Sequence, residues 1–212
     1  MNKTLKLLFL IATLLVPSLS WANITFTLGN NPQPDEENVL LNNGTSGSTV
    51  SGTTNQSGVT VNFISATQIL SEPSSGQARI EATSGGSQVA LSDISSITSA
   101  TGPFGDLIFN MFIGGTIGTS GGTATISVLD NLGFTSTFSE TLGNGQNFLT
   151  VVASAGESID SVAISYSVGF TDLRQVRISG VTAPTVPDSG ATLSLLGASL
   201  IGLAFLRRKL AA

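Results

Sequence analysis

The sequence predicts an all-β fold, an antiparallel β-sandwich of jelly-roll type, for residues 23–183. Apolar and polar residues alternate with a period of two in many short runs, which is the pattern of strands with one buried face. Glycine and asparagine separate these runs, as turns between strands require. The segment has the length of one domain and shows no sustained apolar stripe of helical period, so a helical fold is excluded.

The expected strands follow from where this alternation occurs. In Val59–Phe63 the first, third and fifth residues are apolar, which places them together on one face of a sheet. Asp106–Ile113 carries apolar residues on both faces, which predicts a central strand that is covered on each side. The other expected strands lie at residues 24–28, 77–82, 88–91, 123–128, 134–138, 148–153, 162–168 and 173–178.

Turns and loops are expected where glycine, asparagine or proline accumulate. Tight turns are predicted at Gly85-Gly86, Gly114-Gly115, Gly121-Gly122 and Gly143-Asn144-Gly145. Asn42–Gly58 is nearly free of apolar residues, which predicts a long excursion or an irregular edge. Pro32–Glu37 is a second expected loop, and the two prolines of Thr182–Pro187 predict an extended linker.

The N-terminal segment has the features of a secretory signal peptide. Lys3 and Lys6 precede a ten-residue apolar stretch, which is too short to span a bilayer comfortably. Ser20 and Ala22 supply the small residues that a signal peptidase needs at positions minus three and minus one. We therefore expect residues 1–22 to be removed by signal peptidase between Ala22 and Asn23.

The C-terminal segment combines a polar motif, an apolar span and a basic stop. These three parts are Val186-Pro187-Asp188-Ser189-Gly190, the uncharged run Ala191–Leu206 and the cations Arg207-Arg208-Lys209. Such an order predicts a transmembrane helix at 191–206 with its basic end, 207–212, on the cytoplasmic side. At 1.5 Å per residue the span is roughly 24 Å long, against roughly 30 Å of hydrocarbon, which favours a transient anchor.

The exported part of the chain is acidic and lacks two chemically important residue types. Between residues 23 and 186, twelve carboxylates oppose three arginines, a net charge of −9 that would repel nucleic acid. The chain has no cysteine, so no disulfide stabilises it. It has no histidine, which excludes Ser–His–Asp and Cys–His catalysis and imidazole-bound zinc or copper.

A pair of carboxylates acting as acid and base is the remaining catalytic option. The candidates are Asp106, Glu140, Glu157 and Asp160. Solvated strand ends and turns explain such residues better in an acidic protein. The single tryptophan, Trp21, lies in the signal peptide, so the usual aromatic platform for sugars is nearly absent. The sequence therefore predicts a protein without enzymatic activity.

Calcium is the most plausible metal, because hard oxygen ligands are abundant. Asp35, Glu36 and Glu37 are consecutive, and Asp172 at a late strand end could join them. This predicts a calcium-dependent carbohydrate-binding module as an alternative function. Asn42–Gly58 offers amide and hydroxyl groups for a polar sugar site.

The C-terminal tail resembles the sorting signal of PEP-CTERM-type proteins, in the variant that has VPDSG in place of Pro-Glu-Pro. The resemblance rests on the motif Val186–Gly190, the apolar run Ala191–Leu206 and the cations at 207–209. The resemblance implies that an exosortase recognises the VPDSG motif and cleaves at or near it. Exosortases are membrane-embedded transpeptidases of Gram-negative bacteria linked to extracellular polysaccharide. The resemblance thus implies delivery through the inner membrane to the cell surface or the medium.

Two inner segments, Phe104–Asn110 and Leu173–Val181, resemble stretches of the ectodomains of such proteins, which implies a shared sandwich. The sequence as a whole predicts an exported surface or matrix protein with a structural or adhesive role, in contact with polysaccharide. Two alternatives remain open: the calcium-dependent carbohydrate-binding module, and a single-pass membrane protein that stays anchored permanently.

Overall fold

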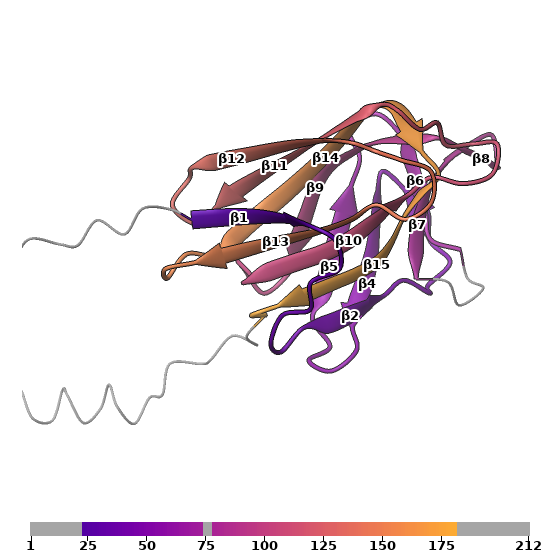
Figure 1. Ribbon diagram of the computed structural model, residues 1–212. Helices are drawn as coiled ribbons and strands as arrows, with labels where there is room; N and C mark the ends of the chain where they lie inside the picture. The colour runs from indigo at the N-terminus through magenta and orange to yellow at the C-terminus, as the bar shows by residue number, and fades with distance from the viewer. Residues whose placement is uncertain (1–22, 74–77, 182–212) are drawn as a thin grey trace, which may run out of the picture.

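Figure 1 shows the computed structural model, which describes residues 23–73 and 78–181. The described part of the chain forms fifteen β-strands and confirms the predicted all-β fold. In chain order the strands are β1 (Asn23–Leu28), β2 (Glu37–Leu40), β3 (Ser46–Gly47), β4 (Thr49–Thr54), β5 (Thr60–Ile64), β6 (Ile69–Ser71), β7 (Arg79–Ser84), β8 (Ser87–Val89), β9 (Leu91–Ser99), β10 (Asp106–Phe112), β11 (Thr123–Asp130), β12 (Thr135–Thr141), β13 (Phe148–Ser154), β14 (Ile159–Phe170) and β15 (Asp172–Ser179).

The strands form two main sheets that pack against each other (Figure 1). The first sheet has the order β1-β13-β10-β15, and the second has the order β2-β4-β5-β9-β14-β11-β12. β2 also pairs with the end of β15 and so joins the sheets, whereas β7 pairs with the beginning of β15. β3, β6 and β8 form a small group around β7. Every one of these pairings is antiparallel, as the sequence predicts.

The hydrophobic core lies between the two sheets. Phe109 of β10 and Leu149 of β13 belong to the first sheet, and they share one buried cluster with Phe63 of β5 and Ile164 of β14 from the second. The inward residues alternate with outward ones along most strands, as in β11, where every second residue from Ala124 is buried. The alternation in the sequence therefore reports the core faces directly.

β10 is buried on both faces, which confirms the central strand predicted from its sequence. Phe109 points into the core, and Ile108, on the opposite face, is also fully buried. The connection between β1 and β2 lies against this outer face. The backbone N–H of Asn31 donates to Oγ1 of Thr150 (3.1 Å), whose hydroxyl donates to the carbonyl oxygen of Gly29 (2.9 Å). Thr150 is the partner of Ile108 in the sheet, so this connection covers the first sheet from outside.

The turn predicted at Gly85-Gly86 is confirmed as the two-residue connection of the β7–β8 hairpin. Both glycines have positive φ, +59° and +80°, and their flanking residues Ser84 and Ser87 are paired. Two consecutive positive φ values define the type I′ turn, which matches the twist of antiparallel strands and which glycine adopts without strain.

The loop predicted at Asn42–Gly58 is wrong, because this segment contains β3 and β4, and β4 lies inside the second sheet between β2 and β5. Its inward positions hold Val50, Gly52 and Thr54, so only one of them carries a large apolar side chain. The loop predicted at Pro32–Glu37 is one residue too long, since β2 already begins at Glu37. In both places small or polar residues fill strand positions that periodicity cannot recognise.

Gly52 is required by the close approach of β2. A Cβ atom at this position would lie 2.5 Å from Cγ1 of Val39 and 2.9 Å from the carbonyl oxygen of Leu40. We expect Gly52→Ala to lower the free energy of unfolding by about 1–3 kcal/mol, measured by urea denaturation. Gly143→Ala is the control, because its Cβ would meet nothing closer than Asn147 Oδ1 at 3.9 Å. Equal stability of the two variants would contradict the close approach.

Several predictions concern residues outside the described ones. These are the signal peptide 1–22 with its cleavage before Asn23, the linker, the motif 186–190, the transmembrane helix 191–206 and the basic tail 207–212. Within residues 23–73 and 78–181, no helix has the length and apolarity needed to cross a membrane.

Candidate functional site

An open groove of about 420 Å³ lies on the outer face of the first sheet, where β15 meets β2. Asn38, Leu40, Phe148, Gln175 and Arg177 are among its lining residues. A smaller hollow of about 220 Å³ adjoins it and shares two of its residues, at positions 78 and 175. We refer to the two hollows together as the outer groove.

The outer groove exists because two strands share one edge of β15. The beginning of β15 pairs with β7, where Arg174 lies opposite Arg79, and its end pairs with β2, where Arg177 lies opposite Asn38. Between these pairings the chain bulges at Gln175, a non-glycine residue with a φ of +54°. The bulge shifts the register with β10 and leaves Gln175 exposed, while the neighbouring Val176 stays buried.

Gln175 is held in this unusual conformation by two hydrogen bonds. Its backbone N–H donates to the carbonyl oxygen of Ala78 (3.2 Å), and its side-chain oxygen accepts a hydrogen bond from Nδ2 of Asn110 (3.1 Å). Asn110 is fully buried under the groove. Non-glycine residues with positive φ are uncommon and concentrate at functional sites, which makes this bulge a marker for the groove.

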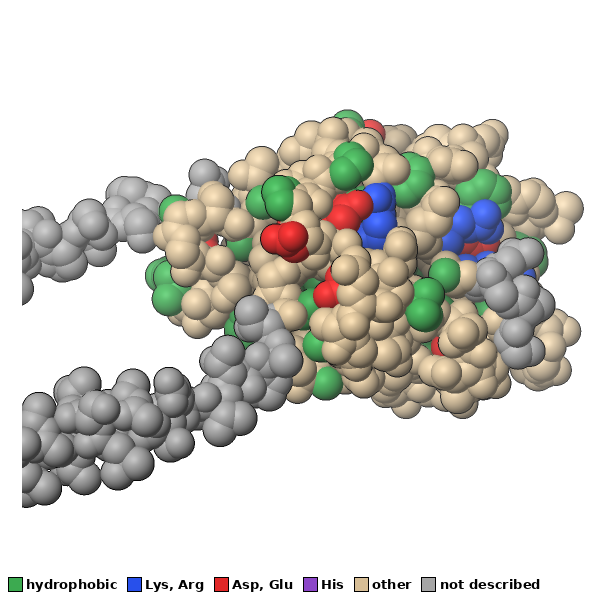
Figure 2. Space-filling model, turned by 90° about the horizontal axis from the view of Figure 1, so that it is seen from below, with side chains coloured by type: hydrophobic (Ala, Val, Ile, Leu, Met, Phe, Trp, Pro, Cys, Tyr) green, Lys and Arg blue, Asp and Glu red, His purple; other side chains and the backbone are tan. Residues whose placement is uncertain are grey.

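The outer groove collects all three arginines that occur between residues 23 and 181. Arg79 pairs with Glu81 at 2.5 Å, and the other two pair with Asp172 and Glu36. Figure 2 shows the basic side chains of this face in two places, each beside acidic ones. The groove therefore presents guanidinium donors and carboxylate acceptors side by side, at nearly balanced charge.

Aromatic and apolar surface accompanies these polar pairs. The guanidinium of Arg174 lies 3.7 Å from the centroid of the Phe112 ring, a cation–π contact that fixes its plane. Leu40 is 43% exposed at the groove, and Phe148 lines its other side. These residues could not be singled out from the sequence, because Leu40 lies outside every expected strand and Phe148 lies at the very start of one. The sequence did carry one signal for the groove. The three arginines between residues 23 and 181 fall within only two of the expected strands, 77–82 and 173–178.

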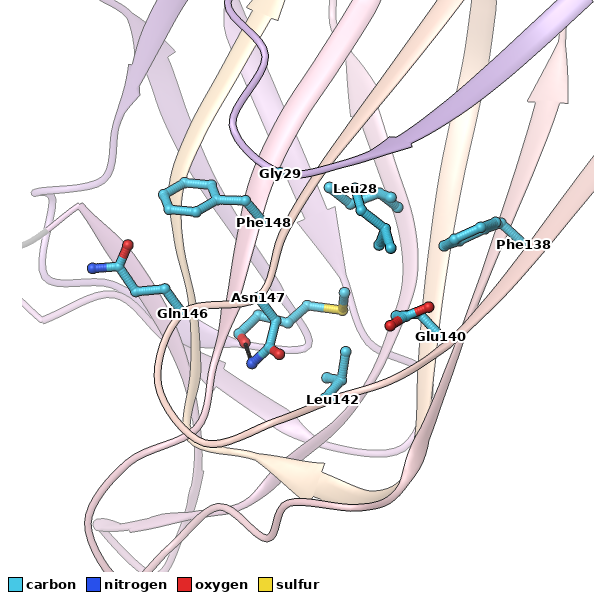
Figure 3. Close-up of a pocket in the computed structure, with 10 residues that line it drawn as sticks. Leu28, Gly29, Phe138, Glu140, Leu142, Gln146, Asn147 and Phe148 are labelled. Carbon is cyan, nitrogen blue, oxygen red and sulfur yellow. Dashed lines mark hydrogen bonds between the residues drawn. The ribbon is translucent and has the colours of Figure 1, made fainter.

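A second pocket, of about 260 Å³, opens at the edge of the sandwich between β13 and β12 (Figure 3). Leu28, Leu142 and Glu140 point toward one another across it. Phe138 on its rim stacks on Phe26 with ring centroids 5.3 Å apart, and this contact closes the edge between the two sheets. We refer to this cavity as the edge pocket.

The polar wall of the edge pocket is built by Asn147, whose side chain is occupied by the backbone around it. Its Nδ2 donates to the carbonyl oxygens of Met111 (3.0 Å) and Gly143 (2.9 Å), and its Oδ1 accepts from the N–H of Gly143 (2.9 Å). These bonds fix the turn predicted at 143–145. They leave the edge pocket mostly apolar, with Glu140 as its charged group.

The structure does not bring the predicted calcium ligands together. Glu36 and Asp172 each pair with an arginine of the outer groove. Glu37 instead accepts hydrogen bonds from the chain at residues 56–57, and Asp35 is exposed. Among residues 23–73 and 78–181, no three acidic side chains gather in a way that suits a metal ion.

The four carboxylates considered for acid–base chemistry belong to three strands or their ends. Asp106 begins β10 in the first sheet, Glu140 lies on β12 in the second, and Glu157 and Asp160 flank the start of β14. Burial raises the pKa of Asp106. A hydrogen bond from the Ser179 hydroxyl lowers this pKa in part, and the negative charge of Glu36 raises it further. Of these four, Glu140 lines the edge pocket, and none lines the outer groove.

The comparisons with known proteins concern the tail first. The VPDSG-CTERM motif family matches residues 185–210. No curated protein matches the chain. A solved structure of a mutant of CBM29-2, a family 29 carbohydrate-binding module, is similar over 74% of this chain and 89% of that one, at 13% identity. Its TM-score is 0.21, which is too low to support any conclusion about fold or ligand.

The matched residues include the whole predicted motif Val186–Gly190, the apolar run and the basic stop 207–209. Their match indicates an exported, surface-directed protein. At residues 185–210, C-terminal to an all-β antiparallel domain, this chain carries the VPDSG-CTERM motif, a variant of the PEP-CTERM-type sorting signal.

Proposed function

We propose that this chain is a surface or matrix protein without enzymatic activity, whose tail is cut by an exosortase-type transpeptidase of a Gram-negative bacterium. Signal peptidase would remove residues 1–22, and the C-terminal span would hold the domain in the inner membrane only until cleavage at Val186–Gly190. The VPDSG-CTERM match at residues 185–210 carries this proposal. The role of the released or attached domain would be structural or adhesive.

Intact mass spectrometry of the protein from surface fractions tests the processing. We expect a mature chain that begins at Asn23 and ends near Pro187. Asp188→Ala should abolish processing, whereas Pro184→Ala, just outside the matched residues, should be processed normally. A surface protein that retains Leu210–Ala212 would instead support permanent anchoring and contradict the proposal.

We further propose that the outer groove binds an uncharged polysaccharide. Paired guanidinium and carboxylate groups offer donors and acceptors to neighbouring hydroxyls, and charge-assisted hydrogen bonds are the strong ones. Leu40 and Phe148 offer apolar surface for the faces of sugar rings. The groove is open rather than enclosed, which suits a chain that extends beyond the site. The net charge of −9 disfavours an acidic polymer.

Binding to a set of neutral and acidic polysaccharides, measured by isothermal calorimetry, tests this function. Arg174→Gln should weaken binding about tenfold, because one charge-assisted hydrogen bond is lost. Glu140→Gln is the matched control, since it changes a carboxylate in the edge pocket alone, and its affinity should equal the wild type's. Loss of binding in Glu140→Gln but not in Arg174→Gln would move the site to the edge pocket. Loss on chelation of calcium would favour the calcium-dependent alternative.

A further inference from the structure

The two most exposed large apolar side chains of the described residues lie together on one turn. Leu132 is 58% and Phe134 63% exposed, and both belong to the connection between β11 and β12. Oδ1 of the buried Asp130 accepts hydrogen bonds from their backbone N–H groups, at 2.8 and 2.9 Å. Gly133 between them has a φ of +86° and donates to the Asp130 carbonyl oxygen (3.1 Å). The turn is therefore built to hold these side chains outward.

This turn lies at the end of the sandwich where β15 ends (Figure 1). The N–H of Asn131 donates to the carbonyl oxygen of Ser158 at 3.0 Å. The next residue, Ile159, exchanges two hydrogen bonds with Phe104, at 2.9 and 2.7 Å. The backbone N–H of Gly105, which follows Phe104, donates to the carbonyl oxygen of Ser179 at 2.9 Å. A continuous series of hydrogen bonds thus connects the turn to the end of β15.

The length of the linker keeps this end close to any membrane that holds the tail. Nine residues, 182–190, separate Val181 from the start of the apolar run at Ala191. Fully extended, they reach about 30 Å at most. When the run lies in a bilayer, as the proposed function requires, the end of the sandwich that carries the turn must stay within that distance of the bilayer.

We propose that the turn Leu132–Phe134 is a membrane-contact site that enters the interfacial region of an uncharged lipid surface while the tail is inserted. The segments that form this end, 100–105, 130–134, 154–159 and 179–181, contain no lysine or arginine and carry two carboxylates. Attraction to anionic headgroups therefore cannot hold it, and apolar insertion is the available contact.

Two apolar side chains bind a bilayer weakly by themselves, but a tether turns this contact into an intramolecular one at high effective concentration. The contact thus acts only before the tail is cut. It fixes how the sandwich stands on the membrane and keeps the VPDSG motif at the surface, and it is lost on release. This inference rests on the proposed function, since without an inserted tail the turn meets no membrane.

Tryptophan fluorescence of the full chain in phosphatidylcholine vesicles tests the proposal. Trp21→Phe removes the single native tryptophan, and Phe134→Trp then places a probe on the turn. The matched control is Val168→Trp, which is 48% exposed and lies nine residues along β14 from Ile159, about 30 Å away. We expect emission from the turn to shift to shorter wavelength and to be quenched by brominated lipid at least twofold more than the control.

Vesicle flotation separates this proposal from the proposed function. If the chain does not float with the vesicles, the tail is not inserted and both fail. If it floats and the two probes are quenched alike, the membrane contact alone is wrong. Quenching that increases with phosphatidylglycerol would overturn the apolar contact, and a shift that depends on protein concentration without lipid would show that a second copy covers the turn.

Discussion

Replacement of Phe109 by alanine is expected to lower the free energy of unfolding by about 3–5 kcal/mol. Phe109 is fully buried on β10, the strand that is covered on both faces, and it lies opposite Leu149 in the first sheet. Truncation to alanine removes the apolar contacts of the ring and leaves a cavity. The hydrogen-bonded strands around this cavity cannot move inward to fill it. Urea denaturation measured by far-ultraviolet circular dichroism gives the change directly.

Phe134→Ala is the matched control for this experiment, because it removes the same atoms from a side chain that is 63% exposed. Its stability should stay within about 0.5 kcal/mol of the wild type. If both substitutions cost the same, the core does not lie between the two sheets as described.

Glu37→Ala is expected to lower the free energy of unfolding by about 2–3 kcal/mol. Glu37 begins β2, the strand that joins the two sheets. Its Oε2 accepts from the backbone N–H groups of Gln56 (2.9 Å) and Ser57 (2.7 Å) and from the Ser57 hydroxyl (3.1 Å). Alanine would leave these donors without a partner. Glu37→Gln keeps an oxygen acceptor and should cost less than half as much.

The same carboxylate gives a pH dependence. Burial opposes the ionisation of Glu37, but the hydrogen bonds from Ser57 and Gln56 outweigh it and hold its pKa below the usual 4.5. Because the folded-state pKa lies below the unfolded one, the stabilisation is present above pH 4.5 and is lost as the pH falls through the folded-state pKa. Unfolding followed from pH 7 to pH 3 should show this loss in the wild type and a smaller one in Glu37→Gln. Parallel curves would contradict the assignment.

Strands with one large apolar residue at every second position could be predicted from the sequence. β11 and β14 lie where the alternation places them, and β10 lies where a run that is apolar on both faces predicts a covered strand. The two inner segments that resemble known ectodomains, 104–110 and 173–181, prove to be partners in the first sheet, paired from Asp106 with Ser179 to Asn110 with Arg174. Here the local pattern and the tertiary structure agree.

β9 was missed for a physical reason. Its buried apolar residues Leu91, Ile94 and Ile97 recur at every third position, which is not the period of a regular strand. Register shifts between β9 and β14 explain this spacing. A bulge adds one residue to a strand, so the next apolar side chain still faces the core although it comes three positions later in the sequence. Such a shift depends on the partner strand, so the local sequence alone does not identify the segment as a strand.

The outer groove could not be predicted for a similar reason. Arg79 and Arg174 are far apart in the chain and meet because β7 and β15 pair in one particular register. The motif at 186–190 could be read directly from the sequence, because a contiguous pattern of residues identifies it without any tertiary contact. The tail motif is therefore readable from the sequence alone, whereas the outer groove depends on the order in which the strands pair.

β15 carries the outer groove and also leads to the tail, and this gives the domain a mechanical property. A polymer held at Arg174–Arg177 and a tether beyond Val181 would pull this strand along its own axis. β15 is hydrogen-bonded to β10 on one side and to β7 and β2 on the other. A force between these two points runs through the covalent backbone of β15 itself, while the hydrogen bonds on both sides hold that strand in place. Under the proposed function, tension between the bound polymer and the tether would therefore pass through this one strand and leave the rest of the sandwich unloaded.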